Sequence, residues 1–200
     1  MRKLHLLLPL ALFALVLGLV ACGGGGDSDE DKIVEVIETS VTSDDPADCK
    51  ELSTQAFMEQ TQASEGAEAV ESCEENAKDK SDDPESVEVS EVEVDGSSAS
   101  ANVAFTGGSF DGQTLSLGLV DEDGDWKLAE ITGFAEFDQE KLVSSFEEAF
   151  ESEEEVPPQL ATCVVETIRE LPKAEAEQLV IGGSQEPVVE IVEGCTEGLE

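Results

Sequence analysis

The chain has 200 residues, of which 48 are acidic and 10 basic, and its formal charge at neutral pH is −38. A surface this acidic repels nucleic acid and anionic lipid head groups, so neither is expected as a binding partner. Tyrosine is absent and His5 is the only histidine, so two of the side chains that commonly serve in acid–base catalysis are scarce.

The first residues have the layout of a secretory signal. Arg2 and Lys3 precede an apolar run of 17 residues from Leu4 to Val20. This length is at the short limit for crossing a hydrocarbon core about 30 Å thick, and no basic stop-transfer cluster follows. Residues 1–21 are therefore expected to be a signal peptide, with a membrane-spanning anchor as the alternative.

The signal ends in Leu19-Val20-Ala21-Cys22, which resembles the lipobox of bacterial lipoproteins. The resemblance implies that Cys22 becomes the N-terminal residue and carries acyl chains, palmitate among them, on the extracytoplasmic face of the cell membrane. Cleavage would leave 8 basic and 48 acidic residues, a formal charge of −40. Residues 22–32, rich in glycine and acids, are expected to form a flexible tether.

Residues 33–77 have helical spacing. Ile33 and Ile37 fall on one face of a first helix. Asp45-Pro46 predicts the cap and first turn of a second helix, whose apolar stripe continues to Ala56, and Ser64 predicts the cap of a third.

The period changes to two in residues 87–131. Four strands joined by tight turns at Asp95-Gly96 and Asp123-Gly124 predict an antiparallel meander. The alternation slips at Ser90-Glu91, which predicts a bulge in the first strand. The alternating apolar positions after this first strand are Ala99, Ala101, Val103, Phe105, Leu115, Leu117, Leu119, Trp126, Leu128 and Ile131.

Three helices followed by a curved antiparallel sheet resemble the nuclear transport factor 2-like superfamily, which includes SnoaL-like domains. The resemblance covers residues 33–137 and is carried by CKELSTQAFMEQ, the strand pattern and the terminal hairpin LGLVDEDGDWKLAEITGF. It implies an α+β fold in which N-terminal helices pack on a curved four-stranded sheet to form a cone.

Helical spacing returns in residues 138–200, which predict a small all-α unit. Asp138 can cap its first helix, Pro157-Pro158 can begin the next, and Lys173 to Ile181 form a short third helix. The unit resembles small two-cysteine helical appendages of exported proteins. It would either cap the sheet or dock a partner.

Four cysteines follow Cys22, an even number in a chain that carries an export signal. They allow three pairings. We predict Cys49 with Cys73 and Cys163 with Cys195, because each pair lies within one apparent unit. Their spacing does not fit a zinc site.

No catalytic, metal or cofactor site is predicted. The loop beginning at Asp121 lacks the glycine and glutamate of an EF-hand and has Trp126 and Thr132 in their places. Asp111 and Glu136 are acids near the expected rims or ends of the cone, but nothing in the sequence separates them from surface acids.

The function expected from these features is that of a non-catalytic, lipid-anchored extracytoplasmic protein. Its cone would bind a small apolar ligand or offer its surface to another envelope protein. The alternatives are an isomerase-type enzyme that uses the cone pocket, as the resemblance allows, and a structural spacer. An open apolar cavity would favour ligand binding, and a filled cone would favour the spacer.

Overall fold

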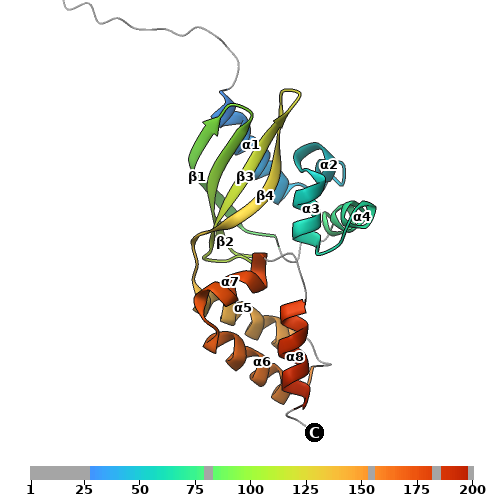
Figure 1. The fold of residues 1–200 in the computed structure, drawn as a ribbon, viewed down its shortest axis with the longest axis vertical. Coiled ribbons are helices and arrows are strands. Elements are labelled where there is room, and N and C mark those ends of the chain that lie inside the picture. Colours follow the sequence, from blue (N-terminus) through green and yellow to red (C-terminus); the bar gives the residue numbers. More distant parts are fainter. Residues whose placement is uncertain (1–27, 79–82, 153–155, 182–185, 198–200) are drawn as a thin grey trace, which may run out of the picture.

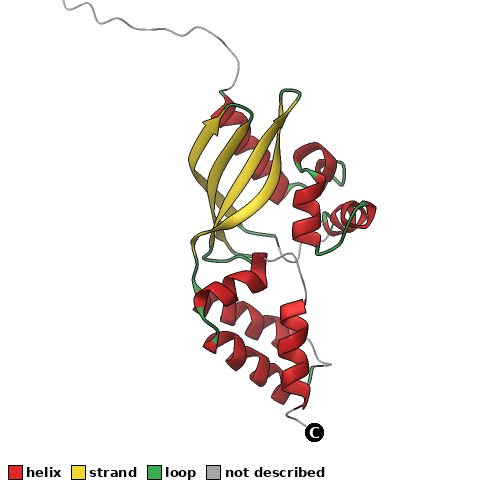
Figure 2. Cartoon of the chain, in the orientation of Figure 1, coloured by secondary structure: helices red, strands yellow, loops and turns green. Residues whose placement is uncertain are grey.

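The structure is a computed structural model that describes residues 28–78, 83–152, 156–181 and 186–197 (Figure 1). Helices precede and follow a single sheet in the described chain (Figure 2). The first helices are α1 (Asp29–Thr42), α2 (Asp48–Leu52), α3 (Gln55–Gln62) and α4 (Ala67–Asn76). The strands are β1 (Ser86–Asp95), β2 (Ser98–Thr106), β3 (Thr114–Glu122) and β4 (Asp125–Glu136). The last helices are α5 (Gln139–Ser152), α6 (Pro158–Glu170), α7 (Lys173–Ile181) and α8 (Glu186–Glu197).

The sheet is an antiparallel meander in the order β1-β2-β3-β4, as predicted. Both predicted turns are present, and positive φ angles at Gly96 (65°), Asp123 (61°) and Gly124 (101°) give them the twist of tight hairpins. The predicted bulge is also present. The β1–β2 register shifts between Ser90 and Glu93, and Glu91 takes a φ of 51°.

The main core lies between α1 and one face of the sheet. Ile33 and Ile37 of α1 are fully buried against the alternating apolar residues of β2, β3 and β4, including Val103 and Leu119. Trp126 is 3% exposed in this core, which confirms its predicted place. Helices and an antiparallel sheet therefore share one core, and the predicted α+β class is confirmed.

Helix α1 begins four residues earlier than predicted, so the expected tether is wrong at its C-terminal end. The Ser28 hydroxyl accepts a hydrogen bond from the Asp31 backbone N–H at 3.2 Å, and the Asp31 carboxylate accepts one from the Ser28 backbone N–H at 3.0 Å. This capping box supplies hydrogen-bond partners for backbone N–H groups at the start of α1, so the helix extends into the acidic segment. Residues 22–27 of the tether lie outside the described residues.

The predicted second helix is divided in two. Thr54 accepts the Phe57 N–H on its hydroxyl and so caps α3, while its own N–H donates to the Leu128 carbonyl of β4 at 2.8 Å. This contact with the sheet edge separates α2 from α3. The prediction that Ser64 caps α4 is wrong. Gly66, with a φ of 61°, precedes that helix, and the Ser64 hydroxyl is buried without a hydrogen-bond partner among the described residues.

Helices α5 to α8 form a second cluster with its own core, at the opposite end of the molecule from the start of α1 (Figure 1). Asp138 caps α5 by accepting the N–H groups of Glu140 and Lys141, and Pro158 is the first residue of α6. These starts and the bounds of α7 agree with the prediction. Val143, Val164, Ile168 and Ala176 form the centre of this core.

The two predicted disulfide pairings are confirmed. Cys49 is bonded to Cys73, with Cα atoms 6.1 Å apart, and joins α2 to α4. Cys163 is bonded to Cys195, with Cα atoms 5.8 Å apart, and joins α6 to α8. The first bond lies within the sheet half of the molecule, from α1 to β4, and the second lies within the helical half, from α5 to α8. Each half is therefore cross-linked independently of the other.

Polar contacts fix the helical half to the sheet half. The buried amide of Gln113 accepts the Asp138 N–H at 2.9 Å and donates to the Asp138 carbonyl at 2.8 Å. Lys141 of α5 pairs with Asp111 of the β2–β3 connection at 2.6 Å. The phenyl rings of Phe134 and Phe137 pack with centroids 4.8 Å apart across the same joint. The joint is therefore specified by side chains from both halves.

Candidate ligand-binding cavity

A cavity of about 420 Å³ lies between the inner face of the sheet and helices α1, α2, α3, α4 and α7. This volume lies in the range of small-molecule sites. The apolar side chains on its wall include six from α3 and three strands: Phe57, Met58, Phe105, Leu117, Leu128 and Ile131. The wall is therefore made chiefly of core-type residues.

The last turn of α1 explains why this space is not filled. Ile33 and Ile37 fill the core along the first turns of the helix. Ser40 and Val41 continue the same face three and four residues after Ile37, and both line the cavity. Ser40 is small, and its hydroxyl donates to the Ile37 carbonyl at 2.8 Å, within the helix. A small residue at this position leaves part of the sheet uncovered.

The amide side chains of the wall are used for structure. Gln60 donates to the Ile131 carbonyl at 2.9 Å and accepts the Ile131 N–H at 2.8 Å, so it pairs with the edge of β4 like a short strand. It also donates to the Ile181 carbonyl at 3.3 Å, which connects α7 to the same wall. Asn76 donates to Gln62 at 2.7 Å. These groups hold the wall together and leave the apolar surface facing the cavity.

The Cys49–Cys73 disulfide is part of the wall. Cys49 is buried, and it packs with Met58 and Ala69 in a small cluster between α2, α3 and α4. The disulfide therefore fixes the helices on this side of the cavity relative to one another.

The ionisable side chains of the described lining are Asp45, Asp48 and Asp83. None of the three was a candidate from the sequence. The two acids considered there, Asp111 and Glu136, do not line the cavity. The sequence carries no distinct signal for the site, since serine is an ordinary residue in a helix and the apolar stripe of α1 continues at Val41.

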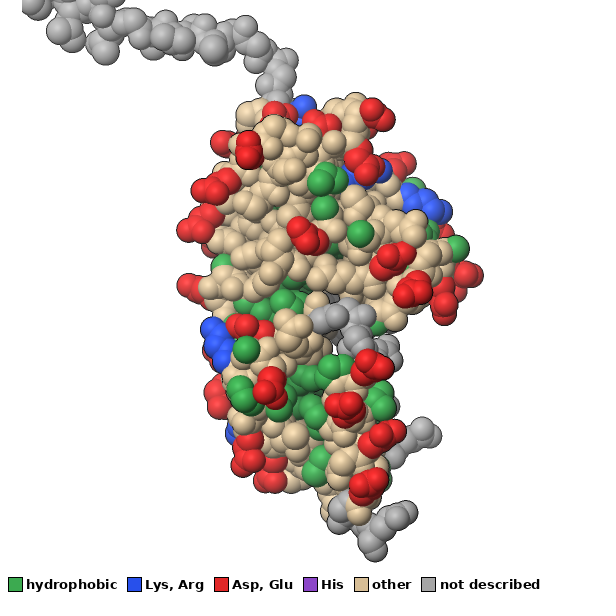
Figure 3. All heavy atoms as spheres, viewed as in Figure 1, with side chains coloured by type: hydrophobic (Ala, Val, Ile, Leu, Met, Phe, Trp, Pro, Cys, Tyr) green, Lys and Arg blue, Asp and Glu red, His purple; other side chains and the backbone are tan. Residues whose placement is uncertain are grey.

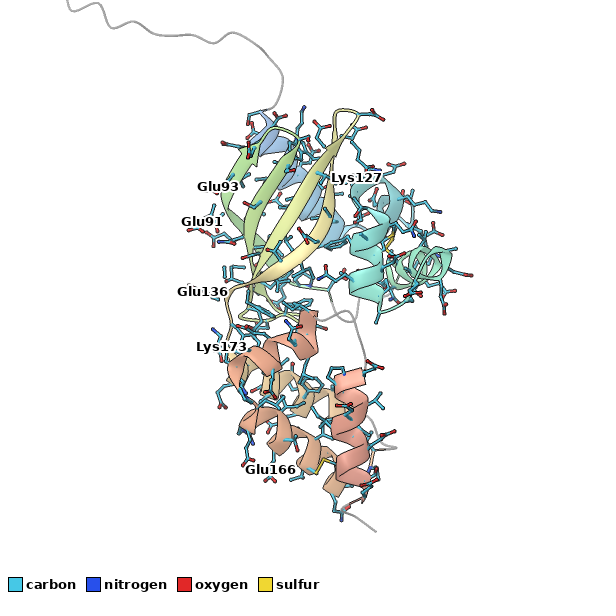
Figure 4. The ribbon with its side chains drawn as sticks, viewed as in Figure 1. Glu91, Glu93, Lys127, Glu136, Glu166 and Lys173 are labelled. Atoms are coloured by element: carbon cyan, nitrogen blue, oxygen red, sulfur yellow. A yellow bond between two sulfur atoms is a disulfide. The ribbon has the colours of Figure 1, made fainter. Side chains whose placement is uncertain are left out.

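Asp111 has a structural place outside the cavity. Its carboxylate accepts hydrogen bonds from Lys141 and, at 2.8 Å, from the Gly107 N–H. The Lys141 hydrogen bond first, and the Gly107 bond next, hold the pKa of Asp111 below its usual range, and the same pair raises the pKa of Lys141. Glu136 is exposed at the end of β4 (Figure 4).

The acidic hairpin tip beginning at Asp121 has the geometry of a turn. Asp121 accepts the Gly124 N–H on its carboxylate at 2.7 Å. Across the described ranges, no group of three or more His, Cys, Asp or Glu side chains is arranged to hold a metal ion.

Acidic side chains are spread over both halves of the visible face, with few basic groups among them (Figure 3). Most basic side chains in the described chain pair with a nearby acid, in the pairs Lys32–Asp29, Lys50–Glu74, Lys127–Glu122, Lys141–Asp111, Arg169–Glu147 and Lys173–Glu177. The surface is therefore strongly anionic and carries little unpaired positive charge.

The signal peptide and Cys22 lie outside the described residues. Among the helices that are described, none has the length and apolar character needed to cross a bilayer. Comparisons with protein-family models, curated proteins and solved structures found no match to this chain.

Proposed function

We propose that the protein is a lipid-anchored, extracytoplasmic binding protein that holds a small apolar ligand in the cavity without transforming it. The cavity itself carries this proposal. It has a volume of about 420 Å³, its wall is mainly apolar, and its amides Gln60 and Asn76 are hydrogen-bonded within the protein. A structural spacer does not need such a space, because filling it would stabilise the fold.

A binding role accounts for the wall better than a catalytic one. Acid–base enzymes place a titratable group with a shifted pKa inside the pocket. Among the described residues, hydrogen bonds lower the pKa values of Asp31, Glu59 and Asp111 and raise the pKa of Lys141, and these four side chains lie outside the cavity. The disulfide and the Gln60 contacts give instead a rigid receptor surface, which lowers the entropic cost of binding.

Native mass spectrometry of the chain without its signal and lipid, beginning after Cys22, tests the ligand. A discrete extra mass that denaturation releases is the expected result. Ser40→Leu would extend the apolar face of α1 into the cavity and should abolish the extra mass. Glu38→Leu, on the exposed side of the same helix, serves as the matched control. Equal ligand mass on both variants would contradict the cavity as the binding site.

The anchor is supported by the lipobox resemblance and is tested separately. Cells that express the full chain are grown with labelled palmitate, and the protein is recovered from the membrane fraction. Cys22→Ala should lose the label and retain the uncleaved signal, while the wild-type chain takes up label. Labelling of the Cys22→Ala variant to the wild-type level would refute lipidation at this residue.

A further inference from the structure

The charge of the cavity rim narrows the class of ligand, an inference that rests on the proposed binding function. The described lining contains three carboxylates, on Asp45, Asp48 and Asp83, and no basic side chain. This lining does not suit a fatty acid. The carboxylate of a fatty acid would lose hydration in the cavity and be repelled by the carboxylates of the protein.

Burial places the carboxylates toward the outside of the cavity and the apolar groups toward its floor. Leu117 and Leu128 are 4% and 2% exposed, so they lie deep. Asp45 is exposed and Asp48 is half-buried. A ligand that fills the cavity would therefore have its apolar part against the sheet and its other end beside these acids.

Asp48 has the environment expected of a group that receives a cation. It stands at the first position of α2, directly before the buried Cys49. No hydrogen bond or ion pair to its carboxylate is formed by the described residues. The nearest basic residue in the sequence, Lys50, pairs with Glu74. Asp45 is held close by, since its carboxylate accepts the Ala47 N–H at 2.9 Å and its carbonyl accepts the Asp48 N–H at 3.1 Å.

We propose that the cavity binds a cationic amphiphile, with an apolar chain or ring system on the Phe105, Leu117 and Leu128 surface and a positively charged group beside Asp45 and Asp48. The partly buried position strengthens the attraction over that of a fully solvated pair, because the effective dielectric constant is lower there. The strongly anionic surface also raises the rate at which a cation arrives.

Titration calorimetry with three probes of equal chain length tests the assignment: decyltrimethylammonium, decanol and decanoate. The two ionic probes are kept below their micelle concentrations, and decanol is kept below its solubility limit. The signal-free chain should bind the cation most tightly and decanoate most weakly. Asp48→Asn should weaken binding of the cation by roughly fivefold to tenfold and leave decanol unchanged, as expected for one partly screened ion pair. Among the three probes, added salt should weaken the binding of the cation alone.

Asp123→Asn is the matched control, because it removes the same charge at the tip of the β3–β4 turn, where asparagine tolerates the positive φ. Equal weakening by Asp48→Asn and Asp123→Asn would overturn the cation site and attribute the preference to net charge. Equal affinity for the cation and decanol would overturn it as well, while the proposed binding function would stand. Failure of all three probes to bind would refute both.

Discussion

Gln113 offers the sharpest test of how the two halves of the molecule are joined. Its side chain is 4% exposed, and its amide makes one donated and one accepted hydrogen bond to the backbone of Asp138. Gln113→Ala removes both bonds. At about 1 kcal/mol each, the free energy of unfolding should fall by about 2 kcal/mol.

Gln113→Glu keeps the shape but changes the hydrogen-bonding capacity. At neutral pH its carboxylate could still accept the Asp138 N–H, but it would lose the donor and face the Asp138 carbonyl. We expect a loss of about 3 kcal/mol or more, because a charge is then buried beside an acceptor. Burial and this carbonyl would raise the pKa of the introduced glutamate.

The raised pKa makes the effect depend on pH in a defined direction. Above the raised pKa the penalty is complete, and it diminishes as the pH falls toward the ordinary glutamate value of about 4.3. The protonated carboxyl would supply one donor and one acceptor, as the amide does. Urea unfolding at pH 7 and pH 4.5, followed by Trp126 fluorescence and circular dichroism, measures each variant against the wild type. An equal deficit of Gln113→Glu at both pH values would refute the two-bond geometry.

Three further perturbations follow from the fold. Ser28→Ala removes the α1 cap and should cost about 1 kcal/mol in urea unfolding, whereas Ser28→Asp should cost little; equal losses would contradict the capping role. Leu119→Ala, in the closed core, should cost about 3 kcal/mol or more, and Leu117→Ala less, near 2 kcal/mol, because the space it leaves joins the existing cavity; the reverse order would contradict the cavity. Asp111→Asn should lower the urea midpoint of unfolding at neutral pH. The difference from the wild type should vanish as the pH falls below the ordinary value of 3.8 and through the depressed pKa of Asp111, because the contribution exists only while the carboxylate is ionised. A difference that stays constant with pH would contradict the ion pair with Lys141.

Much of the fold follows from local patterns. Strand alternation predicted the meander and its inward residues, because the period of two leaves one choice of buried face. The slip at Ser90-Glu91 predicted the bulge for the same reason. The disulfide pairing could be predicted because each pair of cysteines lies within one structural unit of the sequence.

The features that escaped prediction depend on contacts distant in sequence. The break between α2 and α3 exists because the Thr54 N–H bonds to Leu128 of β4, and helical spacing carries no information about that partner. The cavity needs a small residue at Ser40 and an amide at Gln60 that reaches Ile131. These are ordinary residues for a helix, so their role appears only when the sheet is placed beside them.

If Cys22 is lipidated as proposed, the early start of α1 limits the distance between the cavity and the membrane. Under the proposed lipidation, six residue steps separate Cys22 from Ser28, and a fully extended chain of that length spans at most about 21 Å. Helix α1 adds 14 residues, about 21 Å along its axis, before the cavity is reached at its far end. The cavity would therefore lie within about 42 Å of the bilayer. Any molecule that delivers the ligand or receives it would have to lie in the same membrane or come within this distance of it.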